Sequence, residues 1–454
     1  MEWFKINVVK INQEYKIKIT GLNSTGQGVG RIEKFTVFID GALPDEQVKV
    51  KITDIKSNYA IGDLIEIINA SPDRVKPPCP VYNACGGCQL QHLSYTAQLK
   101  WKRQQVIDAV MRIGKIDVEV KNTLGMENPW RYRNKMQFPA SRVKNKICIG
   151  CFARNSHNVI DIESCLIQRQ ENDLILQAAR RVIEKFNLPI YNEDTHRGLI
   201  RHVMGRVGNS ETMLVLVTAS KNLPNEKSIV KALRNELPNI TSIQQNVQSY
   251  HNNVILGRET KVLYGRNTIH DSIGNFNFNI SARSFFQVNT IQTQVLYQKV
   301  LEFADLQGYE TVVDAFCGTG TISLFLARRA KTVTGVEIVS SAIADAKVNA
   351  RINNIRNAQF IIGDVAKIIP TIGINPDVVV LDPPRAGCED KVLKSIAHFK
   401  PAKIVYVSCN PATLARDLAI LETFNYKARV IQPVDMFPFT SHVESVTLLE
   451  AVKN

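Results

Sequence analysis

The sequence predicts an α/β protein of several domains, with an OB-like β-barrel at the N-terminus, an α+β central domain and a Rossmann-like C-terminal domain. The chain has 454 residues, whereas a typical domain has about 150. Short β-rich runs separated by glycine turns fill the first part of the chain. After residue 311, apolar strands alternate with helices, as in a parallel sheet that helices cover on both faces.

The N-terminal domain, residues 1–70, is predicted to be a small barrel. Its β-rich runs are residues 15–20, 36–39, 47–55 and 64–68. The turn between the first two contains Gly26, Gly28 and Gly30. Lys49 and Lys51 would give the barrel the basic surface of an OB-like RNA-binding domain. The alternative is that these lysines are simply solvated.

Residues 71–275 are predicted to form the central domain, which starts at the proline-rich stretch 71–80. Helices are expected at residues 174–186 and 226–236, and a strand at residues 212–218. Residues 130–155 contain seven basic side chains and no acidic one, interleaved with aromatic rings. Such a stretch can stack on bases and contact phosphates, or it can form ordinary strands with the rings turned inward.

The charge balance favours a polyanionic partner. Lys and Arg number 56 against 42 Asp and Glu, which gives a net charge of +14, and nucleic acid is the first candidate. No apolar run approaches the roughly 18 residues that span a bilayer. Glu2 and Lys5 interrupt the N-terminal apolar residues, so we expect no signal peptide, no membrane contact and a cytoplasmic location. Nothing implies an obligate protein partner.

The C-terminal domain, residues 276–454, is predicted to bind a nucleoside cofactor. Its expected strands are residues 311–315, 332–337, 359–362, 378–381, 403–408 and 444–452. The glycine turn after the first strand lets a ligand approach the backbone closely, and Glu337 at the end of the second can accept both ribose hydroxyls. The turn lacks the third glycine and lysine of phosphate-binding loops, which favours S-adenosylmethionine. Asp364 could accept from the adenine amino group.

Two further strand ends carry candidate catalytic groups. Asp382 begins an Asp-Pro-Pro-Arg sequence after the fourth strand, at the sheet edge where ligands bind. Cys409 follows the fifth strand, before Asn410 and Pro411, which suit the N-cap and first turn of a helix. Because a helix dipole favours thiolate over thiol, Cys409 is predicted to be a nucleophile.

The remaining cysteines suggest a metal site. Cys79, Cys85 and Cys88 are closely spaced and Cys165 follows after 76 intervening residues, so four thiolates could bind either zinc or an iron-sulfur cluster. A rival pairing joins Cys85 and Cys88 to a second CxxC, Cys148 and Cys151, around zinc. Cys317 and Cys388 are expected to be core or loop residues.

Several motifs give the whole chain a close resemblance to the RNA uracil-5-methyltransferases, which modify tRNA or 23S rRNA. They are Phe285-Phe286-Gln287-Val288-Asn289, residues 314–320, Asp382-Pro383-Pro384-Arg385-Ala386-Gly387, residues 407–418 and His442-Val443-Glu444-Ser445. The resemblance implies a TRAM barrel and a class I methyltransferase domain that binds S-adenosylmethionine through Gln287, Phe316, Glu337 and Asp382. It also implies Cys409 as nucleophile, Glu444 as general base and a [4Fe-4S] cluster on Cys79, Cys85, Cys88 and Cys165.

The chemistry of uracil fits these assignments. Addition of the Cys409 thiolate at C6 makes C5 nucleophilic, and Glu444 can then remove the C5 proton. The cluster cysteines and the barrel together favour 23S rRNA as the substrate, with the tRNA T-loop as the alternative. Two other classes stay open: an exocyclic-amine methyltransferase that uses the Asp-Pro-Pro wall, and a non-catalytic iron-sulfur protein that binds RNA.

Overall fold

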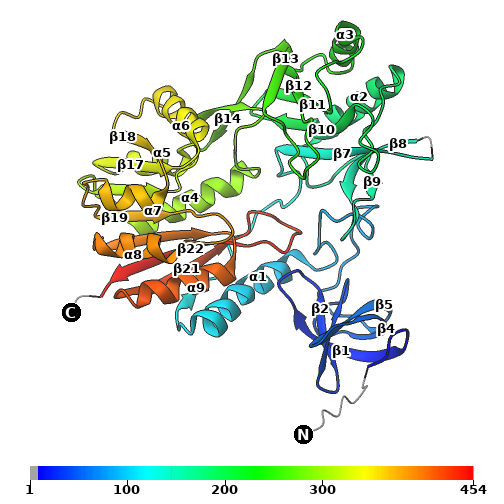
Figure 1. Cartoon of the computed structure of the whole chain (residues 1–454). Coiled ribbons are helices and arrows are strands. Elements are labelled where there is room, and N and C mark those ends of the chain that lie inside the picture. The colour runs from blue at the N-terminus through cyan, green and yellow to red at the C-terminus, as the bar shows by residue number, and fades with distance from the viewer. Residues whose placement is uncertain (1–8, 145, 453–454) are drawn as a thin grey trace.

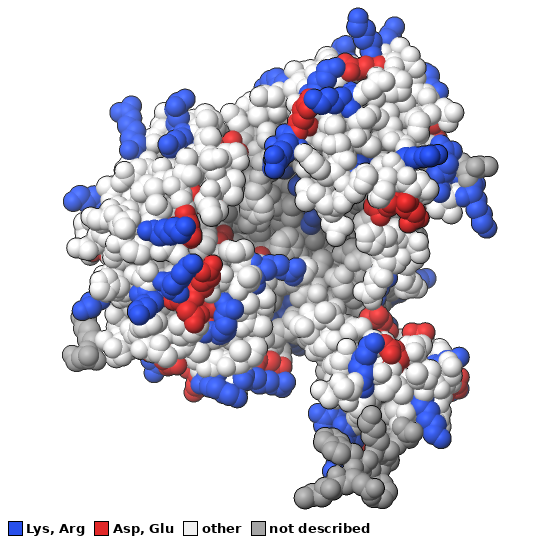
Figure 2. Space-filling model, viewed as in Figure 1, with Lys and Arg blue, Asp and Glu red and all other residues white. Residues whose placement is uncertain are grey.

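The computed structural model describes residues 9–144 and 146–452. Most of the N-terminal segment on which the signal-peptide prediction rests, residues 1–8, therefore lies outside the described residues. The chain forms three parts (Figure 1). The barrel lies at one end, and the central sheet and the C-terminal sheet face each other across a hollow that is visible in Figure 2.

The N-terminal part is a closed five-stranded barrel, as predicted. Its strands are β1 (Glu14–Leu22), β2 (Gly28–Ile32), β3 (Phe35–Ile39), β4 (Gln47–Ile55) and β5 (Tyr59–Asn69). The sequence prediction placed a turn where β2 lies, because two of its five residues are glycines. Gly30 is needed there, since a Cβ atom on it would lie only 2.2 Å from Cγ2 of Ile17 on β1.

The central part contains a seven-stranded sheet in the order β13-β12-β11-β10-β7-β8-β9. The strands are β7 (Lys135–Val143), β8 (Lys146–Phe152), β9 (Val159–Asp161), β10 (Ile200–Val207), β11 (Thr212–Thr218), β12 (Ser242–Val247) and β13 (Glu259–Gly265). Helices α2 (Gln170–Lys185) and α3 (Glu226–Glu236) and strand β11 confirm the three elements expected in this region. Both helices pack apolar faces onto the sheet.

The C-terminal part is a sheet in the order β18-β17-β16-β19-β20-β22-β21-β6. Its strands are β16 (Thr311–Ala315), β17 (Thr332–Glu337), β18 (Ala358–Ile362), β19 (Val378–Leu381), β20 (Lys403–Ser408), β21 (Tyr426–Val434) and β22 (Glu444–Ala451). Its helices are α4 (Thr290–Ala304), α5 (Thr321–Ala327), α6 (Ser340–Ile352), α7 (Val365–Ile368), α8 (Asp390–His398) and α9 (Pro411–Glu422). The six predicted strands are confirmed, whereas β21 was missed. β22 runs antiparallel between β20 and β21, so the sheet is not wholly parallel.

Two elements from the predicted central segment lie against the C-terminal sheet. Helix α1 (Tyr95–Ala109) leads into a π-helical turn (Val110–Gly114), and strand β6 (Glu119–Val120) pairs in parallel with β21. Lys102 on α1 forms a fully buried ion pair with Asp435, with 2.6 Å between Nζ and Oδ1. A two-stranded sheet, β14 (Thr268–Ile273) and β15 (Phe276–Ser281), joins the two larger sheets.

The basic stretch at residues 130–155 does not present its aromatic rings to solvent as a stacking platform. Tyr132 and Phe138 are buried, and Trp130 stacks on Phe439 with ring centroids 3.8 Å apart. Arg131 forms an ion pair of 2.6 Å with Asp173. Burial favours the alternative, ordinary strands with the rings turned inward. Tyr132 and Phe138 nevertheless line a cavity, so contact of these two rings with a base stays a prediction.

Four of the nine cysteines are buried: Cys88, Cys148, Cys317 and Cys388. Cys317 and Cys388 are buried among apolar side chains, as expected. Within the described residues, every helix is too short or too polar to cross a membrane.

Candidate active site

A cavity of about 1550 Å³ lies between the C-terminal edge of the parallel strands and the central domain. Six of the seven predicted catalytic and cofactor residues line it: Gln287, Phe316, Glu337, Asp382, Cys409 and Glu444. Asp364 is not among the lining residues. Its carboxylate caps α7 and accepts a 3.0 Å hydrogen bond from the amide of Ala366, so its contact with adenine stays a prediction.

The turn between β16 and α5 is shaped for close approach of a ligand. Phe316 has a φ of 68°, a left-handed conformation that is uncommon outside glycine and often marks a functional site. Gly320, with φ 78°, lies so near the Phe360 ring that a Cβ atom would be 3.0 Å from it. Glu337 accepts from the amides of Gly318 (3.3 Å) and Val339 (2.8 Å). These bonds hold its carboxylate beside the turn.

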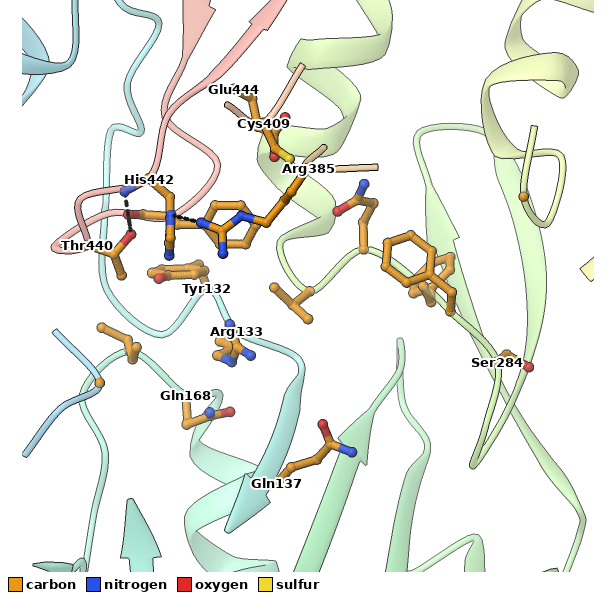
Figure 3. Close-up of a pocket in the computed structure, with 18 of the residues that line it drawn as sticks. Tyr132, Arg133, Gln137, Gln168, Ser284, Arg385, Cys409, Thr440, His442 and Glu444 are labelled. Carbon is orange, nitrogen blue, oxygen red and sulfur yellow. Dashed lines mark hydrogen bonds between the residues drawn. The ribbon is translucent and has the colours of Figure 1, made fainter. Parts of the chain in front are cut away.

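Strand pairing brings the two predicted catalytic residues together. Ser408 at the end of β20 pairs with Ser445 on β22. The next residue of each strand at this sheet edge is Cys409 or Glu444, and their side chains lie side by side in Figure 3. Asn410 caps α9 by accepting a 3.0 Å hydrogen bond from the amide of Ala412, which confirms the predicted N-cap.

Cys409 does not have the lowered pKa that its place before a helix suggested. Burial raises the pKa of its thiol to about 11, and the carboxyl groups of Glu444 and Asp382 raise it further. The guanidinium of Arg385 acts in the opposite direction. Removal from water therefore opposes the effect of the helix dipole in the protein without ligands, and the role of Cys409 as a nucleophile stays a prediction.

The two carboxyl groups nearby also have raised pKa values. Burial, followed by the charge of Asp382, raises the pKa of Glu444 to about 8, and Arg385 opposes this shift. Burial raises the pKa of Asp382 to about 7. A site with this arrangement is prepared to receive a cation, since a positive charge would favour the ionised form of all three groups.

A model of the family described as tRNA (Uracil-5-)-methyltransferase matches residues 94–365 and 371–452, and a TRAM-domain model matches residues 8–65. The chain belongs to the RNA (uracil-5-)-methyltransferase family. A Clostridium tetani protein described as an RNA methyltransferase is 53% identical to it over 97% of both chains. A similarly described protein from Halalkalibacterium halodurans is 49% identical over 97% of this chain and 98% of its own.

A solved structure of similar fold supports the same family. The Pyrococcus abyssi tRNA (uracil-54, C5)-methyltransferase in complex with S-adenosyl-L-homocysteine is 29% identical, with a TM-score of 0.78. The match covers 96% of this chain and 99% of that one. This methyltransferase therefore has the TRAM barrel and methyltransferase domain that the sequence predicted.

The wall opposite Cys409 carries Arg133 from the predicted basic stretch, and two residues that sequence reasoning missed, Gln137 and Gln168. Arg133, Gln137 and Gln168 point into the cavity from the central domain (Figure 3). His442 also lines the cavity, and its Nδ1 lies 2.9 Å from Nη2 of Arg385. His442 begins the His-Val-Glu-Ser motif of the family resemblance, but the sequence assigned it no role.

The predicted metal ligands line the same cavity of the methyltransferase. Cys79, Cys85, Cys88 and Cys165 are joined there by Cys151. A Cβ atom on Gly87 would lie 3.5 Å from the sulfur of Cys85 and 3.7 Å from that of Cys151. Cys148 does not line the cavity, so the rival set of four is not brought together. Across residues 9–144 and 146–452, no group of three or more His, Cys, Asp or Glu side chains has an arrangement that could hold a metal ion.

The raised pKa of Cys409 predicts how this thiol reacts with iodoacetamide. Only the thiolate reacts, so the rate at Cys409 should rise about tenfold per pH unit between pH 7 and 10 in the ligand-free methyltransferase. Mass spectrometry of the peptide that contains Cys409 measures the rate of its modification at each pH.

Glu444→Gln provides the control, because it removes a negative charge that raises the pKa of Cys409. At pH 9, where Glu444 is ionised in the wild type, the variant should react faster. A rate that stays level from pH 7 to 10 would show that the thiol is already ionised at neutral pH.

Proposed function

We propose that this RNA (uracil-5-)-methyltransferase modifies uridine in 23S rRNA through a covalent bond between Cys409 and C6 of the base. The observation that carries the proposal is the placement of Cys409 beside Glu444 at one end of a cavity that also reaches the cofactor turn. A nucleophile and a base that lie side by side suit C5 methylation. Transfer to an exocyclic amine would need no cysteine.

The cofactor turn fits S-adenosylmethionine, with Gln287, Phe316, Glu337 and Asp382 as the residues that would hold it. All four line the cavity, and the half-buried acidic groups favour a cationic ligand. S-adenosylmethionine supplies the methyl group that C5 of uracil accepts.

The residues of the chain then carry out the remaining chemistry. Cys409 gives its proton to water and its sulfur bonds to C6, which places negative charge on the C5–C4–O4 system of the base. Arg385, whose charge favours the ionised forms of Cys409 and Glu444, stabilises this charge. After C5 is methylated, the Glu444 carboxylate removes the C5 proton. The bond between Cys409 and C6 then breaks, which restores the aromatic ring and releases the thiolate, and the thiolate regains a proton from water.

The central domain could bind a [4Fe-4S] cluster through Cys79, Cys85, Cys88 and Cys165. Cys79 and Cys165 pack against Cys88 in one apolar cluster, and Cys85 is near enough to Cys88 to influence its pKa. Soft thiolates in an apolar pocket suit such a cluster. When bound, it would tie the loop at residues 79–88 to the distant Cys165, and we assign it no step in the methylation.

Cys88→Ser is expected to remove the cluster. Protein purified without oxygen should contain iron and sulfide in comparable amounts and little zinc, and the variant should lose most of both together with the visible absorbance. Cys148→Ser is the matched control, since Cys148 lies outside the cavity and should leave the iron content unchanged. Zinc without sulfide in the wild type would contradict the cluster and favour a zinc site.

A tRNA substrate is the second candidate. It is supported by the similarity to the tRNA (uracil-54, C5)-methyltransferase over nearly the whole of both chains. The combination of a TRAM barrel with clustered cysteines favours 23S rRNA instead. In either RNA, the target base must leave its stack to reach Cys409.

Mapping of 5-methyluridine distinguishes the two substrates. A strain that lacks the gene should lose 5-methyluridine from 23S rRNA and retain it in the tRNA T-loop, and wild-type protein should restore it where the Cys409→Ala variant does not. Loss from tRNA alone would establish the second candidate. Unchanged 5-methyluridine in both RNAs would contradict the proposed function.

A further inference from the structure

The guanidinium of Arg385 is held in place by a neutral partner. Nη2 of Arg385 donates to Nδ1 of His442 over 2.9 Å, as the dashed line in Figure 3 shows. In the described part of the chain, no Asp or Glu forms an ion pair with Arg385. A carboxylate partner would offset most of the charge of Arg385, whereas an imidazole that only accepts a hydrogen bond leaves that charge available to the reacting groups.

His442 is kept neutral by its surroundings. Although the His442 side chain is exposed at the cavity wall, desolvation lowers its pKa to about 4, and the positive charges of Arg385, Lys102 and Arg133 act in the same direction. Since Nδ1 accepts the hydrogen bond from Arg385, the ring proton is on Nε2. His442 can therefore serve as an acceptor throughout the neutral pH range.

Both partners sit on well-anchored backbone. The carbonyl oxygen of Arg385 accepts from Asn410 Nδ2 and Thr413 Oγ1, each at 3.2 Å, which ties the loop after β19 to the start of α9. On the other side, His442 belongs to the loop at residues 435–443, which the central domain holds. The carbonyl oxygen of Phe439 accepts from the amides of Gln89 and Leu90, both at 3.0 Å.

We infer that His442 is a positioning residue for methyl transfer, whose Nδ1 holds the Arg385 guanidinium beside Cys409 and Glu444. The inference rests on the proposed function, because it assigns Arg385 to the charge that develops when Cys409 attacks the base. Without His442, the long side chain of Arg385 can rotate into the open cavity. Displacement of a catalytic group by about 1 Å can cost about 100-fold in rate.

The test compares three substitutions at this position. His442→Ala and His442→Phe both remove the acceptor, and the second keeps a ring of similar shape. Both should lower kcat about 10- to 100-fold, while KM for RNA and the affinity for S-adenosylmethionine change less than about threefold. His442→Asn places an amide oxygen near the position of Nδ1 and should recover most of the rate. His398→Ala, an exposed histidine at the end of α8, is the control.

A double-mutant cycle separates positioning from a structural role. If His442 acts through Arg385, His442→Ala should have little further effect in an Arg385→Ala background. Equal losses in both backgrounds would overturn the inference, as would a His442→Phe variant with wild-type kcat or a His442→Asn variant as slow as His442→Ala.

The outcome for His442 is distinguishable from that of the proposed function. Transcripts of the mapped RNA that contain 5-fluorouridine should form a covalent adduct with the wild type, and the rate of adduct formation should fall with kcat in His442→Ala. If the wild type forms no adduct, the proposed mechanism fails. If the wild type and His442→Ala form it equally fast, the mechanism stands and only the role of His442 fails.

Discussion

Replacement of Cys409 by alanine is expected to lower methyl transfer by at least about 10³-fold, the scale on which loss of a covalent nucleophile acts. Without the thiol, no adduct at C6 can make C5 nucleophilic. Binding of S-adenosylmethionine should change little, since its turn follows β16 whereas Cys409 follows β20. The rate of methyl transfer is measured with a labelled methyl group and RNA. The affinity for S-adenosylmethionine is measured by calorimetry.

RNA that contains 5-fluorouridine gives an independent readout for the same variant. The wild type should remain bound covalently through denaturing electrophoresis, because fluorine at C5 cannot leave as a proton does. The Cys409→Ala variant should form no such complex. Cys148→Ala is the matched control and should behave as the wild type. Turnover by Cys409→Ala near the wild-type rate would mean that another group activates the base.

Glu444→Gln should lower turnover by about 10²- to 10⁴-fold, which is the usual contribution of a general base. Glutamine keeps the shape of the side chain but cannot take the C5 proton. The steps before deprotonation can still proceed, so ordinary RNA should accumulate as a methylated covalent complex with the variant. Cys409→Ala should show no complex, and this difference separates the two roles.

Glu450→Gln is the control for Glu444, since it lies on the same strand but forms a surface ion pair with Arg429. It should turn over at the wild-type rate. Normal turnover by Glu444→Gln would move the role of base to another residue. Complete absence of an adduct in that variant would instead place Glu444 before the attack of Cys409.

The pH dependence of the reaction should follow from the same groups. The pKa of Glu444 in the ligand-free protein is about 8 because of burial and Asp382, so its carboxylate becomes more abundant as the pH rises. A positive charge beside Asp382 would shift this ionisation to lower pH. The geometry thus links the protonation of the base to the presence of a cationic ligand.

Local sequence determined most of the secondary structure and the chemical identity of the site. The β16 turn, the Asn410 cap and the five strands of the parallel part depend on residues that are close neighbours in the chain. Glycine conformation, N-cap preference and apolar runs act over a few residues. For the same reason β2 was misread, because Gly30 is required by contact with β1 and Gly28 by contact with Ala42, and neither glycine carries a local signal of a strand.

The tertiary structure alone decided which side chains meet and in what charge state. Cys409 and Glu444 face each other because β20 pairs with β22, and burial in the resulting cavity opposes the lowering of the Cys409 pKa that the helix beginning at Pro411 suggested. Cys151 joins the cysteine site while Cys148 does not, and Arg385 meets His442 across two loops. Desolvation and the distances between charges depend on elements that are remote in sequence, so local sequence patterns cannot predict them.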